Sequence, residues 1–317
     1  MRTSTTAWQF AGILLLALTS GGCATVPYRY RADTLVTADD AILREGESQI
    51  ESGKPRRIID GIGWVVGIPG KIILWDRRID NHHISQETAD RLEAYLAENE
   101  LDKVKVRLNQ YDPCGEWRRL VRNRSVGWPL RYTLGTVSLL DYTILPGRIF
   151  GGDNYNPYTN TISLYSDAPP VAFHEAGHAK DFAHRTWKGT YAAVGLIPGV
   201  DLWQEAIASS DALSYLKDRG SAEDLREGYC ILYPAYGTYV GSAVSPWCGE
   251  VPASLAGALG GHVIGRLKAF SVSDDEPDNS TSDDSGLVDP TDIQFDNSPV
   301  RHADARTNSA NTRTGPR

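Results

Sequence analysis

Residues 166–184 read SDAPPVAFHEAGHAKDFAH, and this stretch decides how the fold is interpreted. It opens with a carboxylate, Asp167, that can cap a helix, and with two prolines, which a helix tolerates in its first turn. Small and apolar residues follow, as expected for a helix that packs in a core. The stretch therefore predicts one buried helix, the motif helix, which carries His174 and His178.

Two histidines and one glutamate on the motif helix form the pattern His-Glu-x-x-His. Side chains four residues apart lie on the same face of an α-helix, so the imidazoles of His174 and His178 can bind one ion. The pattern places Glu175 beside a water at an open coordination position, where it acts as the general base. One catalytic zinc ion is the expected cofactor, because zinc lowers the pKa of such a water to about 7.

Through His174, Glu175 and His178 the chain resembles the zincin metallopeptidases. The resemblance covers the motif helix and its surroundings, residues 140–220, and it fits no particular zincin family over the full length. It implies zinc-dependent hydrolysis of peptide bonds in a peptide or protein substrate. It also implies an α+β fold, mostly helical, in which a small sheet precedes the motif helix and a second helix carries a further ligand. The edge strand of that sheet, which holds extended substrate in zincins, is expected at residues 160–165.

A catalytic zinc needs a third protein ligand, and one candidate is His184. Its spacing from His178 is similar to that of the metzincins. In a continuous helix, however, His184 would lie six residues and roughly 240° beyond His178, facing away from the metal. Metzincins break the helix with glycine, whereas this chain has Asp181 at that position, which adopts a left-handed conformation with difficulty. His184 is therefore kept as the alternative ligand.

The favoured third ligand is Glu205, because residues 203–213 look like the second helix of the gluzincins. Alanines in this segment are small enough for two helices to pack closely around a metal. The ordinary alternative for Glu205 is a salt bridge. Three further side chains are candidates for orienting the ligands: Asp201, Ser209 and Asp181. The tyrosines that could stabilise a developing oxyanion remain open: Tyr155, Tyr158, Tyr191 and Tyr215.

The N-terminus looks like an export signal, with Arg2, an apolar stretch over residues 10–18 and then small residues up to Cys23. The end of this segment resembles a bacterial lipoprotein cleavage box, which makes Cys23 the expected lipidation site and membrane anchor. Ser20 stands where such boxes usually carry leucine, so an ordinary signal peptide is the alternative. Either signal predicts an exported protein. The lipoprotein form is expected in the bacterial cell envelope, on the periplasmic side of a membrane.

Four regions are expected along the chain. They are a signal peptide at 1–23, an N-terminal helical and apolar lead-in at 24–84, a zincin-like catalytic domain at 85–270, and a disordered acidic tail at 271–317. The tail carries ten acidic residues against four arginines and has few apolar residues, so it cannot bury enough surface to order itself.

Within these regions the sequence pattern predicts several elements. A helix is expected at 37–52, and the glycine-interrupted apolar segment 58–75 is expected to be buried or to contact a membrane without spanning it. A capped helix at 85–99 precedes a strand at 104–109 that alternates apolar and polar residues. A hairpin of residues 148–152 and 160–165 is expected before the motif helix. The apolar connection 187–199 after it is expected to lie in the core, and the alternative is a lid or a membrane-dipping loop.

Two further expectations concern close packing and crosslinking. A helix at 256–270 would present glycines at every fourth position as a seam, packed against the protein or in a membrane. Cys230 and Cys248 flank a segment that a crosslink would order, so they are the favoured disulfide in an exported chain.

The overall composition excludes some classes of protein. Hydrophobic residues make up 41% and charged residues 23%, which is typical of a globular protein. The formal net charge is −8, and no basic patch of the kind that binds DNA or RNA is visible. The alternative to a peptidase is a lipoprotein that associates with membranes or partners through its glycine-rich segments, with a structural zinc or no metal.

Overall fold

The computed structural model describes residues 43–197 and 199–274, without the side chains of residues 247 and 248. The expected signal peptide, the lipidation site Cys23 and all but the first four residues of the expected acidic tail lie outside the described residues. No helix in the described ranges combines the length and the apolar character that crossing a membrane requires.

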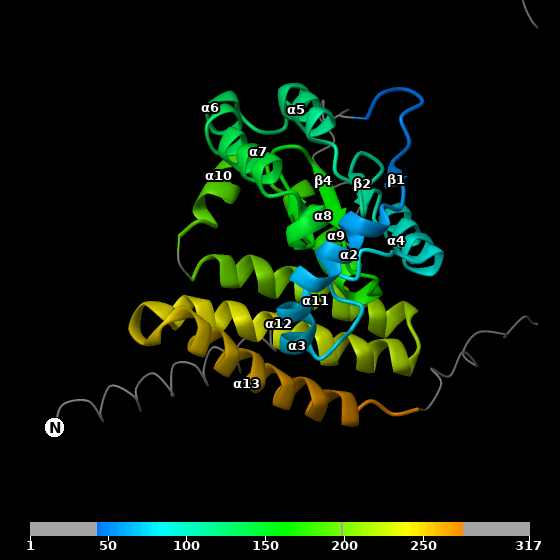
Figure 1. The fold of residues 1–317 in the computed structure, drawn as a ribbon, viewed down its shortest axis with the longest axis vertical. Helices are drawn as coiled ribbons and strands as arrows, with labels where there is room; N and C mark the ends of the chain where they lie inside the picture. The colour runs from blue at the N-terminus through cyan, green and yellow to red at the C-terminus, as the bar shows by residue number, and fades with distance from the viewer. Residues whose placement is uncertain (1–42, 198, 275–317) are drawn as a thin grey trace, which may run out of the picture. The chain divides into compact units, whose positions relative to one another are not determined.

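The described part of the chain is mostly helical and contains a small mixed sheet, which confirms an α+β fold (Figure 1). The strands are β1 (Ile50–Ser52), β2 (Lys105–Leu108), β3 (Asn154–Asn156) and β4 (Thr161–Leu164). Their order is β1-β2-β4-β3, with β3 antiparallel at one edge and the other three parallel.

Helices surround this sheet and extend beyond it. The helices of the first half are α2 (Arg57–Val66), α3 (Ile68–Leu74), α4 (Gln86–Glu98), α5 (Pro113–Arg122), α6 (Trp128–Tyr132), α7 (Leu134–Ile144) and α8 (Gly147–Phe150). Those of the second half are α9 (Pro169–Ala183), α10 (Lys188–Val194), α11 (Asp201–Arg219), α12 (Ala222–Cys248) and α13 (Glu250–Phe270).

The motif helix α9 packs its apolar back into the main core, as its sequence predicts. Ala172, Phe173 and Ala176 are fully buried, and they share one cluster with apolar residues of α4, β2, β4 and α11. The Phe173 ring lies 5.6 Å from the ring of Tyr95 on α4 and 4.9 Å from that of Tyr215 on α11. This burial fixes the side of α9 that faces away from the core, where the histidines lie.

The carboxylate expected to cap α9 has a different partner. Asp167 accepts hydrogen bonds from the backbone N–H and hydroxyl of Ser85, at 2.9 and 2.7 Å, and from the hydroxyl of Thr88 at 2.7 Å. These residues begin α4, the predicted helix at 85–99, whose N-cap is Ser85. Asp167 therefore ties the start of α4 to the entrance of α9, while the N-cap of α9, Ala168, has no side-chain cap.

The strand expected at 104–109 is present as β2, but it is buried on both faces. Its charged face is neutralised by ion pairs with neighbouring elements. The Lys105 ammonium lies 2.5 Å from the Glu51 carboxylate of β1, and the Arg107 guanidinium lies 2.7 Å from Glu116 of α5. A cation can be buried when it is paired in this way, which the alternation of residue types does not reveal.

Two local predictions are wrong in the described residues. The helix expected at 37–52 is absent from residue 43 onward, where β1 pairs in parallel with β2 instead. The predicted hairpin exists, but its first strand is β3 at 154–156, within the expected turn, whereas residues 147–150 form α8. As a result β4 is an interior strand, and the edge strand next to it is β3.

The predicted disulfide and the predicted core connection are also wrong. Cys230 and Cys248 lie on one helix, α12, so their backbones are about 27 Å apart at 1.5 Å per residue, and Cys230 is a free thiol. In the connection 187–199, Trp187, Leu196 and Ile197 are all more than half exposed. This connection is therefore a surface segment, although it is apolar.

The glycine seam expected at 256–270 is present on α13 and packs against α12. A Cβ atom on Gly257 would lie 2.0 Å from the carbonyl oxygen of Gly237, and one on Gly261 would lie 2.3 Å from that of Tyr233. Backbone therefore meets backbone along the α12–α13 pair, as the spacing predicts.

We expect Gly257→Ala to lower the free energy of unfolding by about 1–3 kcal/mol, because the added methyl forces α12 and α13 apart. Gly61→Ala is the matched control. A Cβ on Gly61 of α2 meets nothing within 4 Å, so alanine should stabilise that helix by roughly 0.5–1 kcal/mol. Denaturant unfolding measures both variants, and equal losses would contradict the close-contact explanation.

Asp153, between α8 and β3, couples stability to pH. Its carboxylate accepts the backbone N–H groups of Tyr165 and Ser166, at 2.6 and 3.0 Å. Burial, and then the charge of Asp80, raise the pKa of Asp153 to about 7. The folded state therefore holds a proton between about pH 4 and pH 7 that the unfolded chain releases, and stability falls as pH rises through that window.

We expect Asp153→Asn to remove this decline. Relative to wild type, the variant should gain on the order of 2–4 kcal/mol between about pH 4 and pH 8. Urea unfolding across that range measures the slope, with Asp102→Asn at an exposed position as the control. Parallel pH profiles for wild type and Asp153→Asn would contradict the assignment.

Candidate metal centre

Two helices bring His174, His178 and Glu205 together. The Nε2 atom of His174, on α9, lies 3.1 Å from Glu205 Oε2, on α11, and that of His178 lies 3.3 Å from Glu205 Oε1. The two Nε2 atoms are 3.2 Å apart. Among the described residues, this is the group of His, Cys, Asp and Glu side chains that could hold a metal ion. Two imidazole nitrogens and one carboxylate fit a divalent transition metal that keeps an open coordination position.

Small residues let α9 and α11 approach closely enough to form this group. A Cβ atom on Gly177 would lie 3.0 Å from the carbonyl oxygen and 3.1 Å from the Cα atom of Ala208. Ala208 and Ala212 of α11 are fully buried at this contact. Gly177, the residue before His178, therefore permits backbone contact beside the three donor side chains.

A buried ion pair joins the same two helices one turn further along. The Lys180 ammonium of α9 lies 2.5 Å from the Asp211 carboxylate of α11, and both side chains are at most 2% exposed. The Asp211 carboxylate also accepts the hydroxyl of Tyr95 from α4. The charge of Lys180 is therefore neutralised inside the helix interface. The sequence separates Lys180 and Asp211 by 31 residues, so only the fold shows that they pair.

One of the three candidate orienting residues contacts a donor side chain. The hydroxyl of Ser209 lies 3.2 Å from Nδ1 of His174, which leaves Nε2 of that ring directed at the group. Asp201 accepts the backbone N–H of Gly199 at 3.0 Å, in the first turn of α11. Asp181 is buried and accepts the Tyr191 hydroxyl at 2.5 Å.

His184, the alternative ligand, is not brought into the group. Helix α9 continues through Asp181 to Ala183, so it has no break at Asp181 to redirect the chain. Nδ1 of His184 lies 2.7 Å from the carbonyl oxygen of Lys180 in its own helix. The 240° rotation that the sequence predicts for a continuous helix accounts for this position.

Glu175 is enclosed beside the group. It is 7% exposed, and the backbone of Tyr155 in the edge strand β3 donates a hydrogen bond to its carboxylate. Burial raises the pKa of Glu175, and the charge of Glu205 adds to that effect, while His174 and His178 oppose it. The net result is a carboxyl group that binds a proton more readily than an exposed glutamate does.

The electrostatics of the donor residues are those of an ion pair. Burial by itself lowers the pKa of His178, but the neighbouring carboxylates, Glu205 first, outweigh it and raise this pKa to about 9. Burial raises the pKa of Glu205, yet His178 and His174 together hold it well below its usual range. The negative charge at the group therefore favours a cation beside Glu205.

A tyrosine that the sequence reasoning missed is coupled to this site by charge. Burial raises the pKa of Tyr239, on α12, well above 10, and the charges of Glu205 and Glu175 act in the same direction. The Tyr239 side chain as a whole is 38% exposed, so part of it is open to solvent. Of the expected tyrosines, Tyr155 and Tyr191 donate their hydroxyls to Asn160 and Asp181 instead. The only sequence signal for Tyr239 is a series of tyrosines three or four residues apart on α12.

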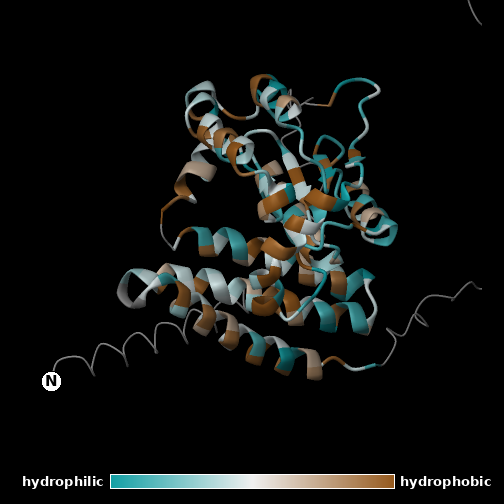
Figure 2. Cartoon of the chain, viewed as in Figure 1, coloured by the Kyte–Doolittle hydropathy of each residue, from teal (hydrophilic) through white to brown (hydrophobic). Residues whose placement is uncertain are grey.

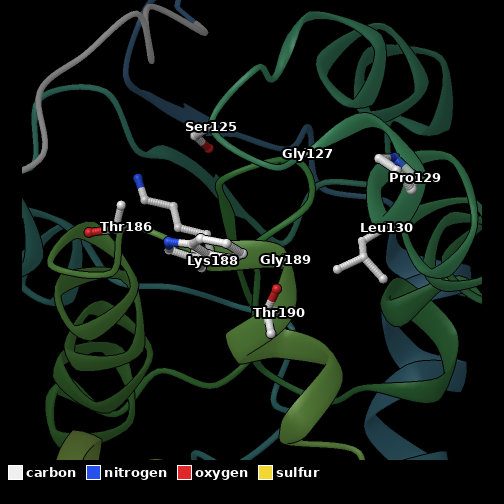
Figure 3. A pocket seen from close by; sticks show the side chains of 9 residues that line it. Ser125, Gly127, Pro129, Leu130, Thr186, Lys188, Gly189 and Thr190 are labelled. Atoms are coloured by element: carbon white, nitrogen blue, oxygen red, sulfur yellow. The ribbon is translucent and has the colours of Figure 1, made fainter.

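A pocket of about 450 Å³ lies elsewhere, between residues 125–130 and residues 186–190 (Figure 3). None of the metal-binding group lines it. Its walls come from α6 and the segment before it, and from the start of α10 and the residues before that helix, so it is separate from the candidate metal centre.

Comparison of the chain with protein-family models, with curated proteins and with solved structures finds no match. The functional argument therefore depends on the geometry of the site.

Proposed function

We propose that the protein is a zinc metallopeptidase of zincin-like fold and gluzincin type, exported and anchored to a membrane by a lipid on Cys23. His174, His178 and Glu205 hold one catalytic zinc ion, and Glu175 is the general base. One observation carries this proposal. The two imidazoles and the carboxylate converge within 4.8 Å of one another, beside a buried glutamate in the predicted motif.

The residues around the ion have separable tasks in this proposal. Zinc, when bound, lowers the pKa of a water and polarises the peptide carbonyl. Glu175 takes a proton from the attacking water and passes one to the leaving amine, and its raised pKa brings it closer to the pH at which it operates. Ser209 holds the ring of His174 in orientation through Nδ1.

The edge strand β3 supports a peptide as substrate. On its inner side β3 pairs with β4, and among the described strands none pairs with its outer side. An extended peptide can add to such an edge through main-chain hydrogen bonds. Because the backbone of Tyr155 in β3 binds the Glu175 carboxylate, a peptide on that edge lies next to the general base.

Metal removal tests the proposal directly. The purified protein is treated with a chelator, then supplied with zinc, and incubated at each stage with a mixed peptide library analysed by mass spectrometry. Chelation should abolish cleavage, and about one equivalent of zinc should restore it. Circular dichroism at each stage monitors folding. A protein that binds zinc, stays folded and cleaves no peptide or protein substrate would assign the ion a structural role.

Tyr239 is the expected donor to the oxyanion that develops at the substrate carbonyl. Tyr239→Phe should lower kcat by roughly 10²-fold and leave zinc content unchanged, because the phenol acts on the transition state rather than on the metal. Tyr233→Phe, on the same helix and without electrostatic coupling to the centre, is the matched control. Equal activity of the two variants in the library assay would exclude Tyr239 from this role.

A further inference from the structure

We propose that the protein docks on an anionic lipid surface through an apolar face formed by α13 and α3, independently of any lipid on Cys23. We call this the docking face. It consists of the outward side chains of α13, together with Ile72 and Trp75 at the end of α3. It lies on helices that contribute no residue to the candidate metal centre, so the inference stands apart from the proposed peptidase activity.

The outward side of α13 is apolar along its whole length. From Val251 to Phe270, every exposed residue is apolar. The largest of these side chains, 44–86% exposed, are Val251, Leu255, Leu259, Val263, Leu267 and Phe270. They follow one another at steps of three or four residues and so form a stripe about 30 Å long on the helix. Monomeric soluble proteins rarely expose a contiguous apolar surface of this extent.

Helix α3 extends this stripe sideways. The His262 ring of α13 lies 2.8 Å, through Nε2, from the carbonyl oxygen of Ile73, and it stacks on the Trp75 ring at 4.0 Å. Trp75 is nevertheless 58% exposed and Ile72 64% exposed, so both remain open to a partner. Figure 1 shows α3 close to α13, and Figure 2 shows hydrophobic residues recurring along α13.

The charged residues beside the docking face indicate what kind of surface binds to it. After Glu250, α13 contains no acidic residue and carries Arg266 and Lys268. Lys71 of α3 is buried, and its ammonium donates to two backbone carbonyl oxygens, so it does not add to this charge. The Arg266 guanidinium lies over the Trp75 ring, 4.4 Å from its centroid, at the edge of the face. Long basic side chains can lay their stems on apolar surface and direct their charges to lipid headgroups, and tryptophan favours the same depth. An anionic bilayer offers negative charge along the whole face.

A second copy of the chain matches the docking face less well. Two α13 helices packed against each other would offer the basic residues only one acidic partner per helix, Glu250 at its start. If α13 lies parallel to the membrane surface, its apolar side enters the boundary between headgroups and acyl chains. Its basic side chains then meet anionic lipid headgroups. The docking face therefore fits a lipid surface.

Vesicle binding by the full chain tests the proposal, with Cys23→Ala in every variant so that acylation cannot contribute. The vesicles are phosphatidylcholine alone or phosphatidylcholine mixed with phosphatidylglycerol. Leu259→Glu with Val263→Glu should weaken binding to the mixed vesicles roughly tenfold or more. The control pair is Val121→Glu with Val137→Glu, exposed to a similar degree on α5 and α7, and it should bind as the parent does. Circular dichroism verifies that each variant is folded.

Photolabelling locates the contact without relying on affinity. Phosphatidylglycerol with a photoreactive group in its acyl chain should label peptides of α13 and α3 in the parent protein. Label confined to residues outside these helices would overturn the proposal, as would equal binding of the two glutamate pairs. Crosslinks between α13 of two copies that form without vesicles, together with unlabelled α13 in their presence, would assign the face to self-association and overturn it as well.

Discussion

Glu175→Gln is expected to lower kcat by roughly 10³-fold while the zinc content stays at one ion per chain. The amide keeps the size of the side chain and cannot accept the proton of the attacking water. Glu175 is not among the three donor side chains, which lie within 4.8 Å of one another on the open side of α9. The metal should therefore bind as in wild type. Elemental analysis of the purified variant and the peptide-library assay measure the two properties separately.

The control for this substitution is Glu93→Gln, the same chemical change at an exposed position of α4. It should leave both zinc content and cleavage unaltered. A Glu175→Gln variant that cleaves the library as fast as wild type would remove Glu175 from catalysis. One that loses zinc would instead show that the buried carboxylate supports the metal, and the role of general base would then need another residue.

Glu205→Ala is expected to weaken zinc binding by roughly 10³-fold or more, and activity should fall with the metal. Its carboxylate lies 3.1 Å from His174 and 3.3 Å from His178, so removal takes away the one carboxylate that pairs with both imidazoles. Competition with a chromogenic zinc chelator measures the affinity. Excess zinc should restore part of the activity, because the general base is intact.

His184→Ala is the decisive control for the third ligand. Its Nδ1 atom is occupied by the carbonyl of Lys180 in the same helix, so zinc affinity should stay within a factor of about two. If His184→Ala lost the metal and Glu205→Ala retained it, the assignment of the third ligand would be reversed, and the site would resemble a metzincin centre rather than a gluzincin one.

Predictions that depend on a local pattern agree best with the structure. The proline-led start and the apolar back of residues 166–184 specify helix α9, and Ser85 specifies the start of α4. The steps of four between glycines in α13 specify its close packing on α12. In each case the residues on which the prediction depends lie within a few turns of one helix, so the sequence of that helix is sufficient for the prediction.

Features that depend on distant partners could not be predicted. Residues 50–52 form a strand only because β2 lies beside them, and a short polar segment carries no sign of that pairing. The proximity of Glu205 to the histidines could be proposed only from a family resemblance. The contacts of Lys180 with Asp211 and of Asp167 with Ser85 join residues far apart in the chain. The sequence shows these polar residues but does not indicate which of them contact one another.

The contact at Gly177 has a consequence for the choice of ion. Because backbone meets backbone there, the two donor-bearing helices are already at their closest approach, and their separation does not depend on a side-chain rotamer. Zinc binds imidazole nitrogen at about 2.0–2.1 Å, whereas calcium needs six to eight oxygen donors at about 2.3–2.6 Å. In the proposed zinc centre, two nitrogen donors held on closely packed helices would therefore favour zinc over alkaline-earth ions.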